Sequence, residues 1–423
     1  MTLDALLYAS LLMLIASAAG VVLLKPRDAV FLLLWFWAGF LARLLLIVAN
    51  DTFEIFDAKQ SDDIVLGVYE SVADDGSPIR KFGVQMLLNW PAFTLFEAKA
   101  PIHFVTNAFL GASAAFVAHA YLSPLFSQRV ARVGAVVMTM APAAVNYSIV
   151  GVRDMLLYLL VMVSALAVLH LQLRARFRAA HAATLVACMA LMFIERPYLV
   201  PVMALPAVLM IVVWAWRRIS DPTRGSARPL LTFSLLLAVP VVAAVVLGGV
   251  YGRLTTVLNL QGEDPIEAIG TFAENRFARD IGTEGGDSHI LPADVYLNTN
   301  SPVRLSVQIV GMIVVPMPWL LTNATRWFAL FDSVLLVVCI TFAVKGARWP
   351  GAPTRLRTAS WIFLLTYAVG IVAFGLATIN AGNAFRMRMT LLPYILIPAS
   401  IHLSRVFDRR ARARRVTSVS EVS

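Results

Sequence analysis

Long apolar runs, separated by short polar segments, follow one another from end to end of this chain. Most are close to the ~20 residues that a helix needs to cross a bilayer. Helices are expected, because an isolated open strand leaves backbone groups unsatisfied in lipid. The predicted spans are 5–24, 29–49, 102–121, 130–149, 155–172, 182–195, 198–215, 230–250, 328–345, 358–378 and 388–403. The pattern predicts an all-α polytopic integral membrane protein, a single domain over 1–423 with about eleven transmembrane helices.

Basic residues gather in short segments between the apolar runs, and these segments predict the orientation of the chain. The strongest are 173–181, 216–228, 345–357 and 405–415. Cytoplasmic loops of membrane proteins carry an excess of Lys and Arg, so all four are expected inside. This orientation makes 404–423 a basic cytoplasmic tail and places the N-terminus outside.

Each span moves the chain to the other side of the membrane, so the expected side of each loop tests this list of spans. Between the first two basic segments the chain must leave and regain the cytoplasm within 182–215, which predicts a hairpin of two short helices broken near Pro197. Between 251 and 345 only one net crossing fits, although 306–321 is also apolar. The stretch 306–321 is therefore expected to be a re-entrant or interfacial element.

Two long polar segments fall outside in this topology, whereas the inner loops are short and basic, so the functional site is expected on the outer face. These segments are 51–101 and 251–305. The first continues from its aspartates into an amphipathic stretch suited to a membrane surface. For any single loop acid, a solvated charge is the commoner role. The candidates are Asp57, Asp62, Asp63 and Tyr69 in the first segment and His289 in the second.

Four arginines reach the outer boundary, although positive charge is normally biased to the inside. They are Arg153, Arg196, Arg386 and Arg388. A guanidinium at that depth is costly unless it pairs or meets an anion, and its N–H fork matches phosphate oxygens, so a lipid phosphate would account for several. Alternatively, Arg153 and Asp154 pair and cap the following helix. The two C-terminal arginines alternatively snorkel to the interface.

Composition supports assignment to the membrane proteins, and the composition and motifs leave several functions without support. Hydrophobic residues make up 59% of the chain and charged residues 14%, which is too apolar for a soluble protein. The net charge of +10 suits inner loops that face anionic lipid, so no nucleic-acid partner is expected. No P-loop, GxGxxG, HExxH or CxxC motif occurs, so nucleotide hydrolysis and the commonest zinc chemistry lack support. The two cysteines lie in apolar spans and predict no disulfide framework.

The order of these features resembles the membrane glycosyltransferases of the GT-C class and the related polymerases of bacterial surface polysaccharides. The motifs are Ser61-Asp62-Asp63 with Tyr69, Asn146-Tyr147-Ser148 before Arg153-Asp154, Arg196-Pro197-Tyr198, and Asn383 through Arg388. The resemblance implies Asp62 or Asp63 as the base towards the acceptor hydroxyl, with the four outer arginines around the donor's lipid phosphate. One feature departs from the family: the acidic loop follows the second helix here, whereas it usually follows the first.

The resemblance further implies a multi-pass enzyme of the bacterial inner membrane that serves cell-envelope polysaccharide assembly. Its partners would be a sugar donor linked to polyprenyl phosphate or diphosphate, a glycan or lipid acceptor, and membrane lipid. No cofactor is evident, and a divalent metal is compatible with the chemistry although the sequence offers no ligand set. A Wzy-type polymerase, a lipid-linked glycan flippase or other transporter, and a non-catalytic subunit stay open. Charges at span ends, with Arg43 as an exception, favour the enzyme over the transporter.

Overall fold

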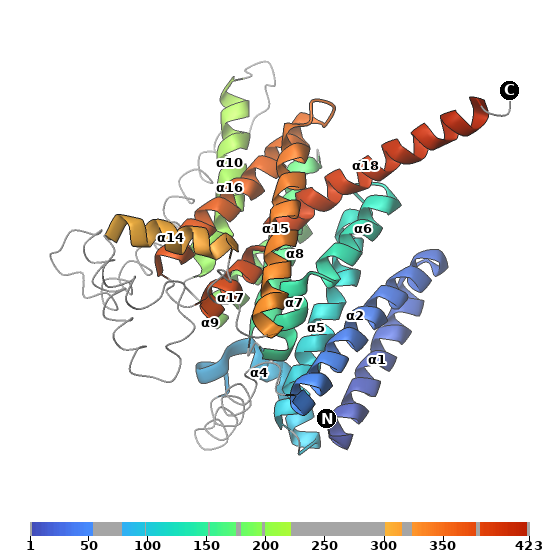
Figure 1. The fold of residues 1–423 in the computed structure, drawn as a ribbon, viewed down its shortest axis with the longest axis vertical. Helices are drawn as coiled ribbons and strands as arrows, with labels where there is room; N and C mark the ends of the chain where they lie inside the picture. Colours follow the sequence, from blue (N-terminus) through green and yellow to red (C-terminus); the bar gives the residue numbers. More distant parts are fainter. Residues whose placement is uncertain are drawn as a thin grey trace.

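The computed structural model describes residues 2–53, 78–97, 99–150, 153–174, 179–196, 199–220, 301–314, 324–377 and 381–420. Within these residues the regular structure is helical throughout, without a strand (Figure 1). The first half contains α1 (Leu3–Leu23), α2 (Pro26–Phe53), α4 (Pro78–Leu95), α5 (Lys99–Leu122), α6 (Gln128–Thr139), α7 (Pro142–Val150) and α8 (Asp154–Leu173). The second contains α9 (Ala179–Glu195), α10 (Val200–Ser220), α14 (Ser301–Val314), α15 (Ala324–Arg348), α16 (Thr354–Ala377), α17 (Ala381–Leu391) and α18 (Pro393–Ser420).

The polytopic, all-helical class is confirmed by the lengths and apolar composition of these helices. Six helices are long and apolar enough to cross a membrane, and the number rises to eight if each of two bent pairs forms one span. The bent pairs are α6 with α7, at 46°, and α17 with α18, at 50°. The predicted number of about eleven spans is not confirmed, since α9 and the apolar part of α10 are shorter and 230–250 lies outside the described residues.

Burial separates a central helix from peripheral ones. Nearly every residue of α8 is buried, and it packs against α5, α9, α10, α16, α17 and α18. In contrast, α1 and α2 expose large apolar side chains such as Leu14, Val22 and Leu45. A soluble protein rarely leaves so much apolar surface in water, so these helices are suited to contact with lipid.

The helix ends sort into two opposite ends of the bundle. At one end, Arg132 of α6 pairs with Asp28 of α2 at 3.1 Å, and the Arg405 guanidinium of α18 lies 4.4 Å from the centre of the Trp349 ring. We call this the basic end. At the other, the Asp4 carboxylate of α1 accepts the Glu97 backbone N–H at 3.0 Å. We call this the site end, because the candidate functional site described in the next subsection lies there. Figure 1 shows the N-terminus at this end and the C-terminus at the basic end.

Helices α4 and α14 also fail as ordinary spans, α4 because it is too polar and α14 because it is too short. Helix α4 lies within the segment 51–101, which the sequence predicted only as a polar loop, and it packs against α5 and α9. Helix α14 has 14 residues and covers only the first part of 306–321, whose remainder lies outside the described residues, so the interfacial or re-entrant element stays a prediction. Figure 1 shows α14 running across the direction of α15.

The single span expected at 130–149 is broken into α6 and α7. Pro142 explains the break, because it has no N–H to donate to the carbonyl four residues earlier, that of Met138. The Tyr158 hydroxyl of α8 donates to this carbonyl oxygen instead, at 2.9 Å. A buried side chain therefore replaces the missing backbone hydrogen bond.

The next carbonyl, that of Thr139, has also changed partner. The Ala143 N–H that would normally reach it donates to Asp332 Oδ1 at 2.8 Å. Arg43 supplies the replacement, since its Nη2 donates to the Thr139 carbonyl at 2.7 Å and its Nε to the Ser148 hydroxyl at 2.9 Å. Arg43 is fully buried, and its guanidinium stabilises the break by hydrogen bonding to a residue on either side of it.

Candidate arginine–carboxylate site

Three of the four arginines nominated from the sequence converge on two buried carboxylates at the site end. Arg153 and Asp154 stand at the start of α8, Glu195 and Arg196 at the end of α9, and Arg386 on α17. The carboxylate side chains are 1% and 0% exposed, whereas the three arginine side chains are 15% to 27% exposed. The acids are therefore covered, and the guanidinium groups form the open side of the cluster.

Asp154 joins the other two chain segments to α8. Its Oδ1 accepts from Arg386 Nε at 2.6 Å and lies 3.5 Å from Arg196 Nη2. Its Oδ2 is buried and has no hydrogen-bond partner among the described residues. A negative charge in the first turn of a helix is favoured by the helix dipole, and two nearby guanidinium groups add to this. Asp154 therefore holds together arginines that are far apart in the sequence.

Glu195 is the second carboxylate of the cluster. Its Oε2 lies 3.8 Å from Arg153 Nη1, and the same nitrogen donates to the Glu195 backbone carbonyl at 3.3 Å. Its Oε1 accepts the backbone N–H of Gln85 at 2.8 Å, which holds α4 against the site. Sequence reasoning did not nominate Glu195, although its position beside Arg196 at a helix end was a usable signal.

Among the described residues, the cluster brings three guanidinium groups to two carboxylates. Burial lowers the pKa of Arg153, and the Glu195 carboxylate raises it again, yet an arginine side chain remains charged in a protein. An added anion would restore part of the stabilisation that burial removes. The cluster is thus suited to bind a phosphate group from its open side.

Arg388 lies nearby on α17 but in a different environment. It is fully buried, and its Nη2 donates to Asp332 Oδ2 at 2.8 Å. Its Nη1 donates to the Ser333 hydroxyl and to the Ile313 carbonyl, both at 2.9 Å. These bonds tie α17 to α15 and α14. Snorkelling to the interface is therefore excluded for Arg388, whose contacts are those of a structural residue.

A buried polar network extends from Glu195 into the bundle. Gln85 Nε2 donates to Asn107 Oδ1 at 2.6 Å, and the Asn107 amide lies 3.3 Å from His103 Nε2. The Asn89 amide lies 2.8 Å from His103 Nδ1. All four side chains are buried. The sequence analysis missed this network, although Gln85 with Asn89 and His103 with Asn107 show the spacing of one helix face.

Several predicted site residues lie outside the described residues. These are Asp57, Asp62, Asp63, Tyr69 and His289, together with Pro197 and Tyr198 of the third motif. The assignment of Asp62 or Asp63 as the base therefore stays a prediction. Among the described residues, no group of three or more His, Cys, Asp or Glu side chains is arranged to hold a metal ion.

Comparison of the chain with protein-family models, with curated proteins and with solved structures found no match.

Proposed function

We propose that this chain is a membrane glycosyltransferase that moves a sugar from a polyprenyl-phosphate or diphosphate donor during cell-envelope polysaccharide assembly. The observation that carries the proposal is the convergence of Arg153, Arg196 and Arg386, all partly exposed, on two buried carboxylates. Such a cluster at a low-dielectric boundary can bind a lipid phosphate and also stabilise the negative charge that develops on it as the sugar leaves.

The arginines would act on the leaving group. As the bond between the sugar's anomeric carbon and the phosphate oxygen breaks, the electron pair and the negative charge pass to that oxygen. The three guanidinium groups stabilise this charge without reorganising, because Asp154 and Glu195 already orient them. The acceptor oxygen attacks the same carbon and passes its proton to an outer carboxylate, for which Asp62 and Asp63 are the candidates.

The proposed orientation puts the site end outside and the C-terminus in the cytoplasm. Its support is the gathering of Lys and Arg at the basic end, on α2, α6, α15, α16 and α18, since such charges are retained on the cytoplasmic side. In a bacterial inner membrane, this orientation presents the cluster to donors that have already been moved to the outer leaflet.

The bonding of Arg43 favours an enzyme over a transporter. A transporter needs charged groups that line a path through the spans. Arg43 is the charge that the sequence places away from a span end, and it is committed to the Thr139 carbonyl, the Ser148 hydroxyl and the Gly39 carbonyl. A Wzy-type polymerase would use the same cluster, and its longer products distinguish it from an enzyme that adds one sugar.

The proposal is tested by Arg196→Ala and Arg386→Ala in a strain that lacks the native protein. Surface glycan is expected to fall about tenfold or more, because each variant removes a charge-assisted contact with the departing phosphate. Arg386→Lys keeps the charge but loses the two-pronged N–H geometry of the guanidinium. Its glycan production is expected to lie between that of Arg386→Ala and that of the unaltered protein. The readouts are glycan per unit of inserted protein and the amount of lipid-linked donor, which accumulates if transfer fails.

The matched control is Arg355→Ala, which removes an exposed arginine at the basic end. It is expected to leave glycan production unchanged. Normal glycan in both Arg196→Ala and Arg386→Ala, with normal insertion, would remove the glycosyltransferase proposal.

A further inference from the structure

A cavity of about 250 Å³ lies at the basic end, between α5, α8 and α9. It is far larger than the ~15 Å³ that a single water needs. It lies at the opposite end of the bundle from the arginine–carboxylate site, because His170 and Arg174 follow Asp154 by the length of α8. Its lining residues are Ala120, Tyr121, Pro124, His170, Arg174 and His181.

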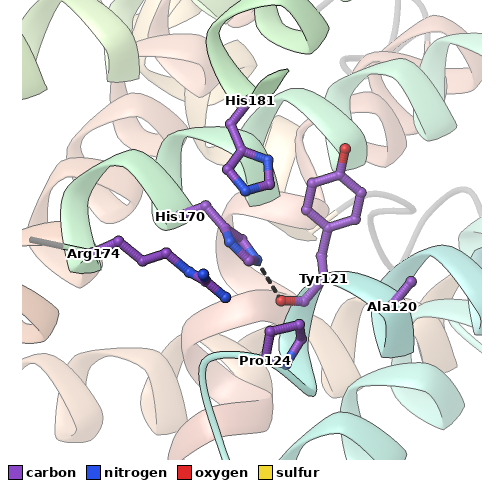
Figure 2. Close-up of a pocket in the computed structure, with 6 residues that line it drawn as sticks. All are labelled: Ala120, Tyr121, Pro124, His170, Arg174 and His181. Atoms are coloured by element: carbon purple, nitrogen blue, oxygen red, sulfur yellow. Dashed lines mark hydrogen bonds between the residues drawn. The ribbon is translucent and has the colours of Figure 1, made fainter. Parts of the chain in front are cut away.

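The lining of this cavity has one arginine, two histidines and no acid. Figure 2 shows the Arg174 guanidinium and the His181 ring on two sides of the His170 ring. The centres of the two imidazole rings are 4.3 Å apart. None of the six lining residues is an Asp or Glu. The cavity is therefore suited to an anion and unsuited to a cation.

The position of His170 is determined by the protein. Its Nε2 donates to the backbone carbonyl of Tyr121, and the Tyr121 ring meets its ring edge to face with centres 5.4 Å apart (Figure 2). His170 is 2% exposed, so this bond is shielded from water. Such a bond holds the imidazole in one orientation beside Arg174. A ligand would meet a preorganised pair, which lowers the entropy cost of binding.

We propose that this cavity binds the phosphate group of an anionic molecule at the basic end, with Arg174, His170 and His181 as the recognising side chains. Arginine holds phosphate oxygens through paired N–H groups, and the His181 imidazole can add an N–H bond. The Nε2–H of His170 is taken by the Tyr121 carbonyl, so His170 donates to a phosphate from Nδ1 when its ring is protonated. Basic pockets between transmembrane helices are a common place for anionic lipid head groups. The phosphate comes from a phospholipid head group or from a soluble phosphate, and the experiment separates the two. The inference does not depend on the proposed glycosyltransferase activity.

The test is calorimetric titration of the full-length protein in a neutral detergent. The probes are dihexanoylphosphatidylglycerol, the zwitterionic dihexanoylphosphatidylcholine and inorganic phosphate. The anionic lipid is expected to bind about tenfold more tightly than the zwitterionic one. Arg174→Gln and His181→Gln are each expected to weaken binding of the anionic lipid about fivefold or more, whereas Arg355→Gln, at an exposed position of the same end, leaves it unchanged.

The outcomes of this titration distinguish the two sources of phosphate and can overturn the proposal. Weak binding of inorganic phosphate beside tight, variant-sensitive binding of the anionic lipid identifies a head-group site. Equal binding of inorganic phosphate, with the same sensitivity, identifies a soluble phosphate ligand. Unchanged binding of the anionic lipid in both cavity variants, or an equal loss in Arg355→Gln, overturns the proposal. If Arg174→Gln fails to fold, His181→Gln decides alone.

Discussion

Burial and bonding divide five arginines of the described helices into two groups. Arg43 and Arg388 are fully buried, and their N–H groups donate to carbonyl, hydroxyl and carboxylate oxygens within the bundle. Arg153, Arg196 and Arg386 are partly exposed and share two carboxylates. The first group is expected to matter for stability. The second is expected to matter for binding and transfer, because its guanidinium groups reach the open side of the cluster.

Asp332→Ala tests the structural role of the first group. It leaves the buried Arg388 without its carboxylate, and breaking a buried pair in this way costs about 3–5 kcal/mol. We expect a lower midpoint of thermal unfolding in detergent and less inserted protein. Asp332→Asn keeps a hydrogen-bond acceptor and is expected to lose less. An unchanged midpoint in Asp332→Ala would contradict the structural role of this pair.

The sequence identified individual arginines but not their partners. A guanidinium at a span boundary is conspicuous by itself, because its cost in lipid requires an explanation. Its partner is decided by packing, and Arg386 meets Asp154 from 232 residues away. Glu195 and Asp332 were missed for the same reason, since neither carboxylate is conspicuous near the end of an apolar run until its arginine partner is known.

At the scale of the helices, the break between α6 and α7 links the site to the rest of the bundle. Three side chains replace its lost backbone bonds: Arg43 of α2, Tyr158 of α8 and Asp332 of α15. The same Asp332 carboxylate holds Arg388 of α17. The broken helix therefore fixes the positions of helices that carry the arginine–carboxylate site.

Tyr158→Phe and Pro142→Ala test this explanation of the break. Tyr158→Phe leaves the Met138 carbonyl buried without its donor, which is expected to cost about 1–3 kcal/mol. Pro142→Ala restores a backbone N–H at the break, so Tyr158→Phe is expected to cost less in that background. Thermal unfolding of the two single variants and the double variant measures this coupling. Strictly additive losses would mean that the hydroxyl does not replace the proline's missing bond.

At the scale of the whole molecule, the hydrophobic pattern predicted an all-helical membrane protein correctly, but it could not determine the number of spans. A hydropathy run does not reveal a bend, so 130–149 and 388–403 were each expected as one span although each is a bent pair. Helix α4 was missed because Gln85 and Asn89 make its run polar, and only packing against α5 and α9 shows that these amides are buried. Local pattern predicts helices, whereas their pairing depends on contacts between distant residues.

The most direct test of the central claim is the binding of farnesyl phosphate, a short soluble analogue of a polyprenyl phosphate, to the purified full-length protein. Farnesol, which lacks the phosphate, is the matched ligand. We predict that, with the basic-end pocket disabled by Arg174→Gln, farnesyl phosphate binds about tenfold or more tightly than farnesol, that adding Arg386→Ala removes this difference, and that adding Arg355→Ala instead preserves it. Equal binding of the two ligands, or full binding by Arg386→Ala, would contradict the assignment of this cluster as the lipid-phosphate site.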